Sequence, residues 1–159
     1  MSTPNDKFKF EVVETDNNKK IILCGVIDED TNFTPLLKLG DTPLTFNFKE
    51  VDSINSCGIR TWVNFLKDLG KTETHYEECT PMIVRQMNMV PSFLGKAHVD
   101  SVYVPYVCEE CETEKSVLLT DDKFKSGKFD LPETLPCESC GKGEMELDGH
   151  PQQYFAFAK

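Results

Sequence analysis

The sequence predicts an α/β fold in which a mostly parallel sheet of four to five strands is flanked by helices and is followed by a small, metal-held β module. Over roughly the first hundred residues, segments with strand periodicity alternate with segments of helix periodicity. Such alternation favours a parallel sheet with helices packed on it. After Tyr106, paired cysteines, turn residues, Glu and Lys dominate. About fifty residues with so few apolar groups would struggle to fold unaided.

Strands are expected at five places in the first region. They are Phe8–Val13, Ile21–Ile27, Leu44–Phe48, Thr74–Cys79 and His98–Val107. The first of these alternates apolar and polar residues, as in a strand with one buried face. The second, Ile21–Ile27, is continuously apolar, which predicts a strand covered on both faces.

Three helices are expected between these strands. They are a short helix over Pro35–Leu39, a long helix over Ile59–Leu69, and a helix from Pro81 to about Val90. The long one has a continuous apolar face, and the other two begin with Thr-Pro, which supplies an N-cap and a first helical residue. Met82, Met87 and Met89 leave open whether the third helix is entirely core or partly an interface.

The chain is acidic, with 27 Asp and Glu against 17 Lys and Arg and a formal net charge of −10. Nucleic acids and anionic membrane surfaces attract clusters of basic residues, and the basic residues here are dispersed. No apolar stretch has the length of a membrane-spanning helix, and Met1–Asp6 lacks the features of a secretory signal. We therefore expect a cytoplasmic protein with no membrane insertion and no nucleic-acid partner.

Seven cysteines are present, and four of them form two Cys-x-x-Cys pairs. Two residues between cysteines allow a tight turn, or knuckle, that presents both sulfurs to one ion. In a reducing compartment such pairs are more often metal ligands than disulfides. We expect one structural Zn²⁺ ion bound by Cys108, Cys111, Cys137 and Cys140, with no coordination position left open for catalysis.

Disulfides are an alternative, but an odd number of cysteines precludes complete pairing. An iron–sulfur cluster also uses four thiolates, usually at tighter spacing than the 25 residues between these two pairs. His150 is a further candidate ligand, although a solvated turn residue is its simpler interpretation.

The remaining features of this region complete the predicted module. Val117–Leu119 and Tyr154–Phe157 are expected to form a small sheet beneath the metal, and Gly141 and Gly143 give the second knuckle the backbone freedom it needs. The pattern resembles a zinc ribbon. We expect it to occupy residues 105–159, after an α/β domain over residues 1–104.

Between Leu44 and Leu69 the sequence has a strand, the loop Val51–Ile59 and an amphipathic helix. With the early Cys24–Asp28 segment, this arrangement resembles the STAS domain. That family includes the anti-sigma factor antagonists and the small subunit of a bacterial lipid-transport ABC system, and the resemblance covers most of residues 8–104. It implies a STAS-like fold, a bacterial signalling role and a partner-binding loop formed by Asp52, Ser53, Asn55, Ser56, Cys57 and Gly58.

In the family, the residue just before the glycine of this loop is a phosphorylated Ser or Thr. Cys57 occupies that position here, and a Ser/Thr kinase cannot phosphorylate a cysteine. Asn55 also replaces the family's Asp. Ser56 is a doubtful phosphate acceptor, because capping the helix is its simpler role.

No catalytic motif is evident, so we expect a protein that is not an enzyme. Cys57 at a helix start has the setting of a nucleophile, but no histidine occurs in a sequence context that places a base beside it. A small residue buried against the sheet is the simpler interpretation of Cys57, and Cys24 and Cys79 are expected in the core. The acidic cluster Asp28–Asp30 is expected to be solvated.

Together these observations predict a non-catalytic regulatory or adaptor protein of the anti-sigma factor antagonist kind. Its partner would be an anti-sigma, kinase-like or other signalling protein, bound through residues 52–60 and the helix that follows. The zinc ribbon would be structural or would extend that interface. The alternatives are a thiol or zinc redox sensor and an accessory STAS subunit of a lipid-transport ABC system.

Overall fold

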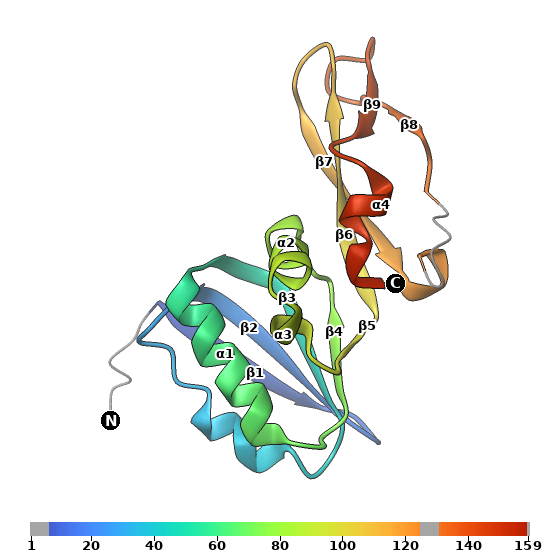
Figure 1. Cartoon of the computed structure of the whole chain (residues 1–159). Helices are drawn as coiled ribbons and strands as arrows, with labels where there is room; N and C mark the ends of the chain where they lie inside the picture. The colour runs from blue at the N-terminus through green and yellow to red at the C-terminus, as the bar shows by residue number, and fades with distance from the viewer. Residues whose placement is uncertain (1–6, 125–130, 159) are drawn as a thin grey trace.

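The computed structural model of the chain describes residues 7–124 and 131–158, which form two sheets and several helices (Figure 1). The first sheet contains β1 (Phe8–Glu14), β2 (Lys19–Ile27), β3 (Leu44–Ile54), β4 (Thr74–Glu77) and β5 (His98–Val99), in that order. β1 is antiparallel to β2, and the other neighbouring strands are parallel. The predicted α/β fold with a mostly parallel sheet is therefore confirmed.

The helical segments of this region are η1 (Thr34–Leu39), α1 (Ser56–Leu69), α2 (Pro81–Met89) and α3 (Pro91–Leu94). α1 buries Trp62, Phe65 and Leu69. Trp62 and Leu69 belong to the apolar face that the periodicity predicts, whereas Phe65 was not predicted to be part of it. Pro91 ends α2 as expected, but the same proline begins the short helix α3, because proline suits the first turn of a helix.

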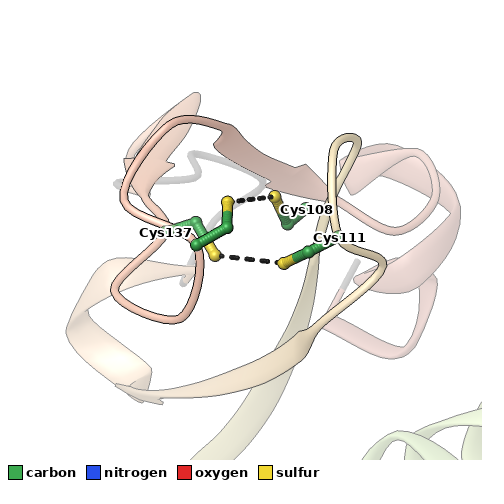
Figure 2. A group of neighbouring side chains, drawn as sticks. Cys108, Cys111 and Cys137 are labelled. Carbon is green, nitrogen blue, oxygen red and sulfur yellow. Dashed lines mark hydrogen bonds between the residues drawn. The ribbon is translucent and has the colours of Figure 1, made fainter.

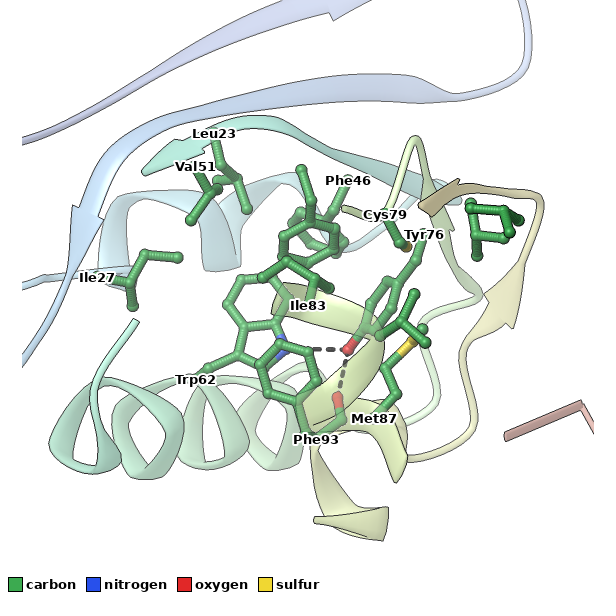
Figure 3. Packing of buried hydrophobic residues seen from close by; sticks show 14 of the residues in the cluster. Leu23, Ile27, Phe46, Val51, Trp62, Tyr76, Cys79, Ile83, Met87 and Phe93 are labelled. Carbon is green, nitrogen blue, oxygen red and sulfur yellow. Dashed lines mark hydrogen bonds between the residues drawn. The ribbon is translucent and has the colours of Figure 1, made fainter. Parts of the chain in front are cut away.

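Aromatic residues form the centre of the core between α1 and the first sheet (Figure 3). Trp62 makes edge-to-face contacts with Phe46 at 4.9 Å and with Phe33 at 5.0 Å between ring centroids. Its Nε1 donates to the hydroxyl of Tyr76 (2.9 Å), which in turn donates to the carbonyl of Phe93 (2.6 Å). This chain of hydrogen bonds ties α1, β4 and α3 together inside the core, and burial raises the pKa of Tyr76 far above its usual value.

The other face of the first sheet is only partly covered. In β2, Ile21 and Leu23 on the helix side are fully buried, whereas Lys20, Ile22 and Cys24 are half-buried. The expectation that this strand is covered on both faces is therefore wrong. On this face Lys20 pairs with Thr45 and Ile22 pairs with Asn47 of β3, so polar side chains stand where a second apolar layer would be needed.

The second sheet has the order β7-β6-β9-β8, with every neighbouring pair antiparallel. Its strands are β6 (Ser101–Cys108), β7 (Glu114–Thr120), β8 (Thr134–Pro136) and β9 (Glu144–Leu147). The single strand expected over His98–Val107 is thus divided. Its first two residues complete the first sheet as β5, and the rest becomes the central strand of the second sheet.

The C-terminal segment is helical rather than extended, so the strand expected over Tyr154–Phe157 is wrong. α4 (Pro151–Tyr154) starts at a proline, and η4 (Ala156–Ala158) follows after the C-cap residue Phe155. Phe155 is fully buried and stacks on Phe124 at 5.3 Å, next to the short η2 (Asp121–Lys123). The apolar residues of this segment pack in this aromatic contact. β9, and not Tyr154–Phe157, pairs with β6 in the second sheet.

The helix α2 belongs to the first α/β region and also contacts β6, α4 and η4 of the second region (Figure 1). Asn88 donates through Nδ2 to the carbonyl of Tyr154 (3.0 Å), so the C-terminal segment contacts α2 directly. Met87 is buried in the core, whereas Met89 is 67% exposed. The methionines of this helix are therefore not all core residues. None of the helices in residues 7–124 and 131–158 is long and apolar enough to cross a membrane.

Candidate metal centre and partner-binding loop

The four paired cysteines come together at one end of the second sheet. Cys108 ends β6 and Cys111 lies in the turn before β7, while Cys137 follows β8 and Cys140 precedes β9. Their Sγ atoms all lie within 4.8 Å of one another. The closest pairs are Cys108 with Cys140 at 3.8 Å and Cys111 with Cys137 at 3.6 Å, so each short distance joins one knuckle to the other (Figure 2).

The two knuckles have nearly the same backbone. The amide of Glu112 donates to the carbonyl of Cys108 (2.9 Å), and the amide of Gly141 donates to the carbonyl of Cys137 (3.0 Å). Each residue after the second cysteine is left-handed, with φ of 62° at Glu112 and 67° at Gly141. The sequence places a glycine at this position only in the second knuckle, so the first carries backbone strain of about 1 kcal/mol.

Gly143 serves the site in a different way. A Cβ atom at this position would lie 2.6 Å from Sγ of Cys108 and 2.8 Å from the side chain of Glu110. The backbone here therefore passes against the sulfur, which only a residue without a side chain permits. Its amide also lies 3.4 Å from Sγ of Cys140, toward which it donates.

The sulfur geometry fits one tetrahedral ion. Four sulfurs at about 2.3 Å from a central zinc ion would be separated by about 3.8 Å. A disulfide would need about 2.05 Å, and all seven cysteines are free thiols. A cluster of several irons would spread the sulfurs over different metal atoms and so farther apart. The donor set of four sulfurs is therefore suited to a single thiophilic ion with a closed coordination sphere.

Local hydrogen bonds favour thiolates at two of the four positions. The hydroxyl of Thr113, 3.0 Å away, and the amide of the same residue lower the pKa of Cys111 to about 6. The backbone amides of Lys142 and Gly143 lower the pKa of Cys140. At Cys108 the amide of Cys111 acts in the same direction, but burial and the neighbouring sulfurs raise the pKa to about 11. A dication would displace these remaining protons, because only thiolates bind it.

Sequence reasoning missed Thr113 as a partner of the sulfurs. A hydroxyl residue two positions after the second cysteine of a knuckle is the signal that could have found it. His150, considered as a further ligand, is the N-cap residue of α4 and is not part of the cysteine cluster.

The partner-binding loop predicted over residues 52–60 lies at the junction of β3 and α1. β3 continues to Ile54, so Asp52 and Ser53 belong to the end of the strand rather than to a loop. Asn55 is the N-cap, and its Oδ1 accepts a hydrogen bond from the amide of Gly58 (2.7 Å). Ser56 is therefore the first residue of the helix, and the expectation that it caps the helix is wrong, because Asn55 already holds that position.

Cys57 is exposed, which contradicts the expectation of a thiol buried against the sheet. The buried residue is its neighbour Gly58, where a Cβ atom would lie 2.3 Å from the carbonyl oxygen of Ile27. The amide of Asn55 also donates to that carbonyl (3.2 Å). These contacts hold the start of α1 against the end of β2, and they leave the side chains of Asp52, Ser53, Asn55, Ser56 and Cys57 exposed.

The burial of Cys24 and Asp28 differs from the sequence predictions, and that of Cys79 agrees with them. Cys79 is fully buried, and burial raises its pKa well above the usual value, whereas Cys24 is only half-buried on the open face of the sheet. Asp28 is buried rather than solvated, and it forms an ion pair with Nζ of Lys7 at 2.7 Å. This cation lowers the pKa of Asp28, with the amide of Asp30 as a further donor.

The described histidines give no base for Cys57. His75 is held between Glu73 (2.7 Å from Nε2) and Asp100 (3.0 Å from Nδ1), and it stacks on His98. Within residues 7–124 and 131–158, no histidine lies in hydrogen-bond contact with the thiol of Cys57.

No family model matches the sequence, and no curated protein matches it. Among solved structures, the chain is similar to an anti-sigma factor antagonist from Mycobacterium paratuberculosis, with 19% identity and a TM-score of 0.47 over 62% of this chain and 89% of that one. It is also similar to the anti-sigma factor antagonist SpoIIAA in its unphosphorylated form, with 12% identity and a TM-score of 0.45 over 57% of this chain and 87% of that one.

Proposed function

We propose that the chain is a non-catalytic regulatory protein of the STAS type, which binds a signalling protein through residues 52–60 and α1. The partner class, an anti-sigma factor or a kinase-like protein, comes from the sequence resemblance around Val51–Ile59. The observation that carries the proposal is the exposed and rigidly held turn at the start of α1.

The turn has the properties of a preformed binding surface. Asn55 caps the helix and Gly58 fixes it against Ile27, so ordering this turn costs little when a partner binds. The first amides of α1 carry partial positive charge, which suits a carboxylate or another acidic group on the partner. Asn55 also donates through Nδ2 to Glu29 (3.2 Å), and that side chain extends the surface beyond the loop.

Regulation of this surface would differ from the usual phosphorylation switch. Cys57 stands at the position of the phosphorylated residue and is exposed. A kinase acting on hydroxyl groups cannot modify it, and the exposed Ser56 beside it in the sequence carries a hydroxyl group. We infer that binding at this turn does not depend on phosphorylation of residue 57.

We further propose that Cys108, Cys111, Cys137 and Cys140 bind one structural zinc ion. The sulfur separations of 3.6 and 3.8 Å support this, since they match the edge of a tetrahedral zinc–sulfur site. The ion would join the β6–β7 turn to the β8–β9 turn and so stabilise a sheet with few buried side chains. Elemental analysis of reduced protein should find one zinc per chain, and less than half an equivalent would contradict the proposal.

The partner proposal can be tested by cross-linking from Cys57 itself. A thiol-linked photo-crosslinker attached to Cys57 in a zinc-loaded Cys24→Ala protein should capture a protein of the anti-sigma or kinase-like class from the source cells. The matched control carries Cys57→Ser with Lys71→Cys, which moves the probe to an exposed position beyond the far end of α1.

The affinity of the purified captured protein for variants of this chain then shows whether Cys57 lies in the interface or only near it. A carboxylate in the interface should weaken binding about tenfold or more, so Cys57→Glu is the decisive variant and Lys71→Glu the control. Gly58 is unsuitable for this purpose, because any side chain there would displace the helix start. Unchanged affinity with Cys57→Glu would show that the turn is not the interface.

A second candidate function is a thiol or zinc redox sensor, which the exposed Cys57 and Cys111 favour. Its test is the rate at which Cys57 reacts with a thiol reagent in the zinc-loaded protein. A sensor should react faster than an unstructured thiol, and zinc release should follow oxidation. A rate no faster than that of a simple thiol, without zinc release, would remove this candidate.

A further inference from the structure

β1 forms one edge of the first sheet and carries the features of an unprotected edge strand. It pairs with β2 over seven residues without a register shift, and no other strand of the described residues lies beyond it. It contains no proline, and the side chains of Phe10 and Val13 are 38% and 40% exposed. Edge strands normally carry a bulge, a proline, a very short pairing or charged side chains that prevent association. β1 has none of the first three, and its central charged residues, Lys9 and Glu11, are of opposite sign, so they can attract a second copy.

The backbone groups at the free edge can be assigned by alternation. The carbonyl of Lys7 accepts from the amide of Val26 (2.7 Å), and the amide of Thr15 donates to Asn18 (2.9 Å), so both residues direct these groups toward the β2 side. In an antiparallel strand the amide and carbonyl of one residue point to the same side, and the side alternates along the chain. The even-numbered residues from Phe8 to Glu14 therefore direct their backbone groups to the free edge.

We propose that β1 pairs with β1 of a second copy of this chain, antiparallel and centred on Phe10. Only pairings that match even-numbered residues align the free amides with free carbonyls. Among these, the register centred on Phe10 places Lys9 of each copy opposite Glu11 of the other. Centring the pair one residue away, on Lys9 or Glu11, keeps the backbone match but places that charged residue opposite its own copy, which is unfavourable. Centring it on Phe8 or Val12 separates Lys9 from Glu11.

This register also fits the apolar side chains. Phe10 meets its own copy across the two-fold axis, and Phe8 lies opposite Val12, all on the face that carries the helices. Phe8 is already part of an aromatic cluster, at 5.4 Å from Phe33 and 6.4 Å from Phe10. Pairing would form about six backbone hydrogen bonds and join two five-stranded sheets into one continuous sheet.

The other edges of the two sheets are less suited to self-pairing. β5 has two residues, and β8 has three and ends in Pro136. β7 is as long as β1, but its opposite charges, Glu114 and Lys115, are adjacent. Adjacent residues direct their backbone groups to opposite sides, so no antiparallel register can both match the backbone and place these two charges opposite each other.

The test is the oligomeric state of the full chain with zinc bound, measured by sedimentation equilibrium. The wild-type protein should be a dimer. Phe10→Pro should abolish association while keeping the fold, because the amide that is lost faces the free edge and not β2. Fluorescence of the single tryptophan, Trp62, reports whether the first core remains intact.

Charge exchange tests the register itself. Lys9→Glu places two carboxylates opposite each other in both pairs, and Glu11→Lys places two ammonium groups there, so each variant alone should dimerise about tenfold or more weakly. An equimolar mixture of the two variants restores opposite charges in both pairs and should recover association near the wild-type level. Lys19→Glu serves as a control away from this edge.

A monomeric wild-type chain at its highest soluble concentration would overturn the proposal and leave the edge to a strand of another protein. A dimer that persists unchanged in Phe10→Pro would place the contact elsewhere and overturn it too. Loss of association in both charge variants without recovery on mixing would reject the register centred on Phe10.

Discussion

Replacing Gly143 by alanine gives the sharpest test of the metal centre. The added Cβ would lie 2.6 Å from Sγ of Cys108. Nonbonded atoms of this size need about 3.5 to 4 Å, so the sulfur or the turn must retreat by about 1 Å. Zinc–sulfur distances vary by only about 0.2 Å among sites. The variant should therefore lose good contact with one ligand, and we expect zinc affinity to fall by about 10- to 100-fold.

Gly141→Ala is the matched control, since it adds the same atom to the same knuckle. No atom lies within 4 Å of a Cβ at Gly141, so the cost is only the left-handed backbone at φ of 67°, about 1 kcal/mol. That cost corresponds to about a fivefold change in affinity if it falls entirely on the zinc-bound state. Gly141→Asn should be milder still, because asparagine tolerates this conformation.

The assay is competition for zinc with a chromophoric chelator, followed while Trp62 fluorescence monitors the first core. We expect the order of affinity to be wild type, Gly141→Asn, Gly141→Ala and then Gly143→Ala, with the core unchanged throughout. The reasoning would be refuted if Gly143→Ala bound zinc as tightly as Gly141→Ala. Zinc that dissociates equally easily from all four proteins would point to ligands other than these cysteines.

Three further predictions follow from the same geometry. Glu112→Gly should relieve the left-handed backbone at φ of 62° and raise the stability of the zinc-bound protein by up to about 1 kcal/mol, measured by thermal unfolding; a loss of stability would contradict the assigned strain. Tyr76→Phe should lower the free energy of unfolding in urea by about 2 kcal/mol or more, because it leaves the buried Trp62 Nε1 and Phe93 carbonyl without their shared partner. A change below about 0.5 kcal/mol would show that these hydrogen bonds contribute little to stability. At His75, burial lowers the pKa, but the hydrogen bonds that the ring donates to Glu73 and Asp100 outweigh burial and hold the pKa above the usual 6.5. The associated stability should be complete below pH 6.5 and lost as the pH rises through the raised folded value, so the urea midpoint of His75→Gln should vary less with pH in that window than that of the wild type.

Local signals allowed much of the fold to be predicted from the sequence. The apolar face that contains Trp62 and Leu69 marks α1, and the alternation of strands and helices indicates a mostly parallel sheet. These features depend on residues close together in the chain. The Cys-x-x-Cys pairs predicted the cluster of four sulfurs equally well, because the chemistry of a tetrathiolate site leaves few other arrangements.

What the sequence did not reveal depends on contacts between distant residues. Nothing local marks Asp100 as the point where one apparent strand leaves the first sheet and enters the second. Tyr154–Phe157 has apolar residues that suit a strand or a short helix, and the aromatic contact with Phe124 decides for the helix. At the loop, Asn55 and Ser56 are both good capping residues, and only the position of Ile27 settles which one caps.

The passage from β5 to β6 through a single residue has a mechanical consequence. Asp100 alone separates the two sheets along the chain, and its amide donates to the carbonyl of Tyr76 (2.7 Å). The next residues remain attached to Cys79, whose carbonyl accepts from the amide of Tyr103 (2.8 Å). The two sheets are therefore joined by hydrogen-bonded backbone and not by a flexible linker. A displacement at the cysteine-bearing end of the second sheet would be transmitted to β4 of the first.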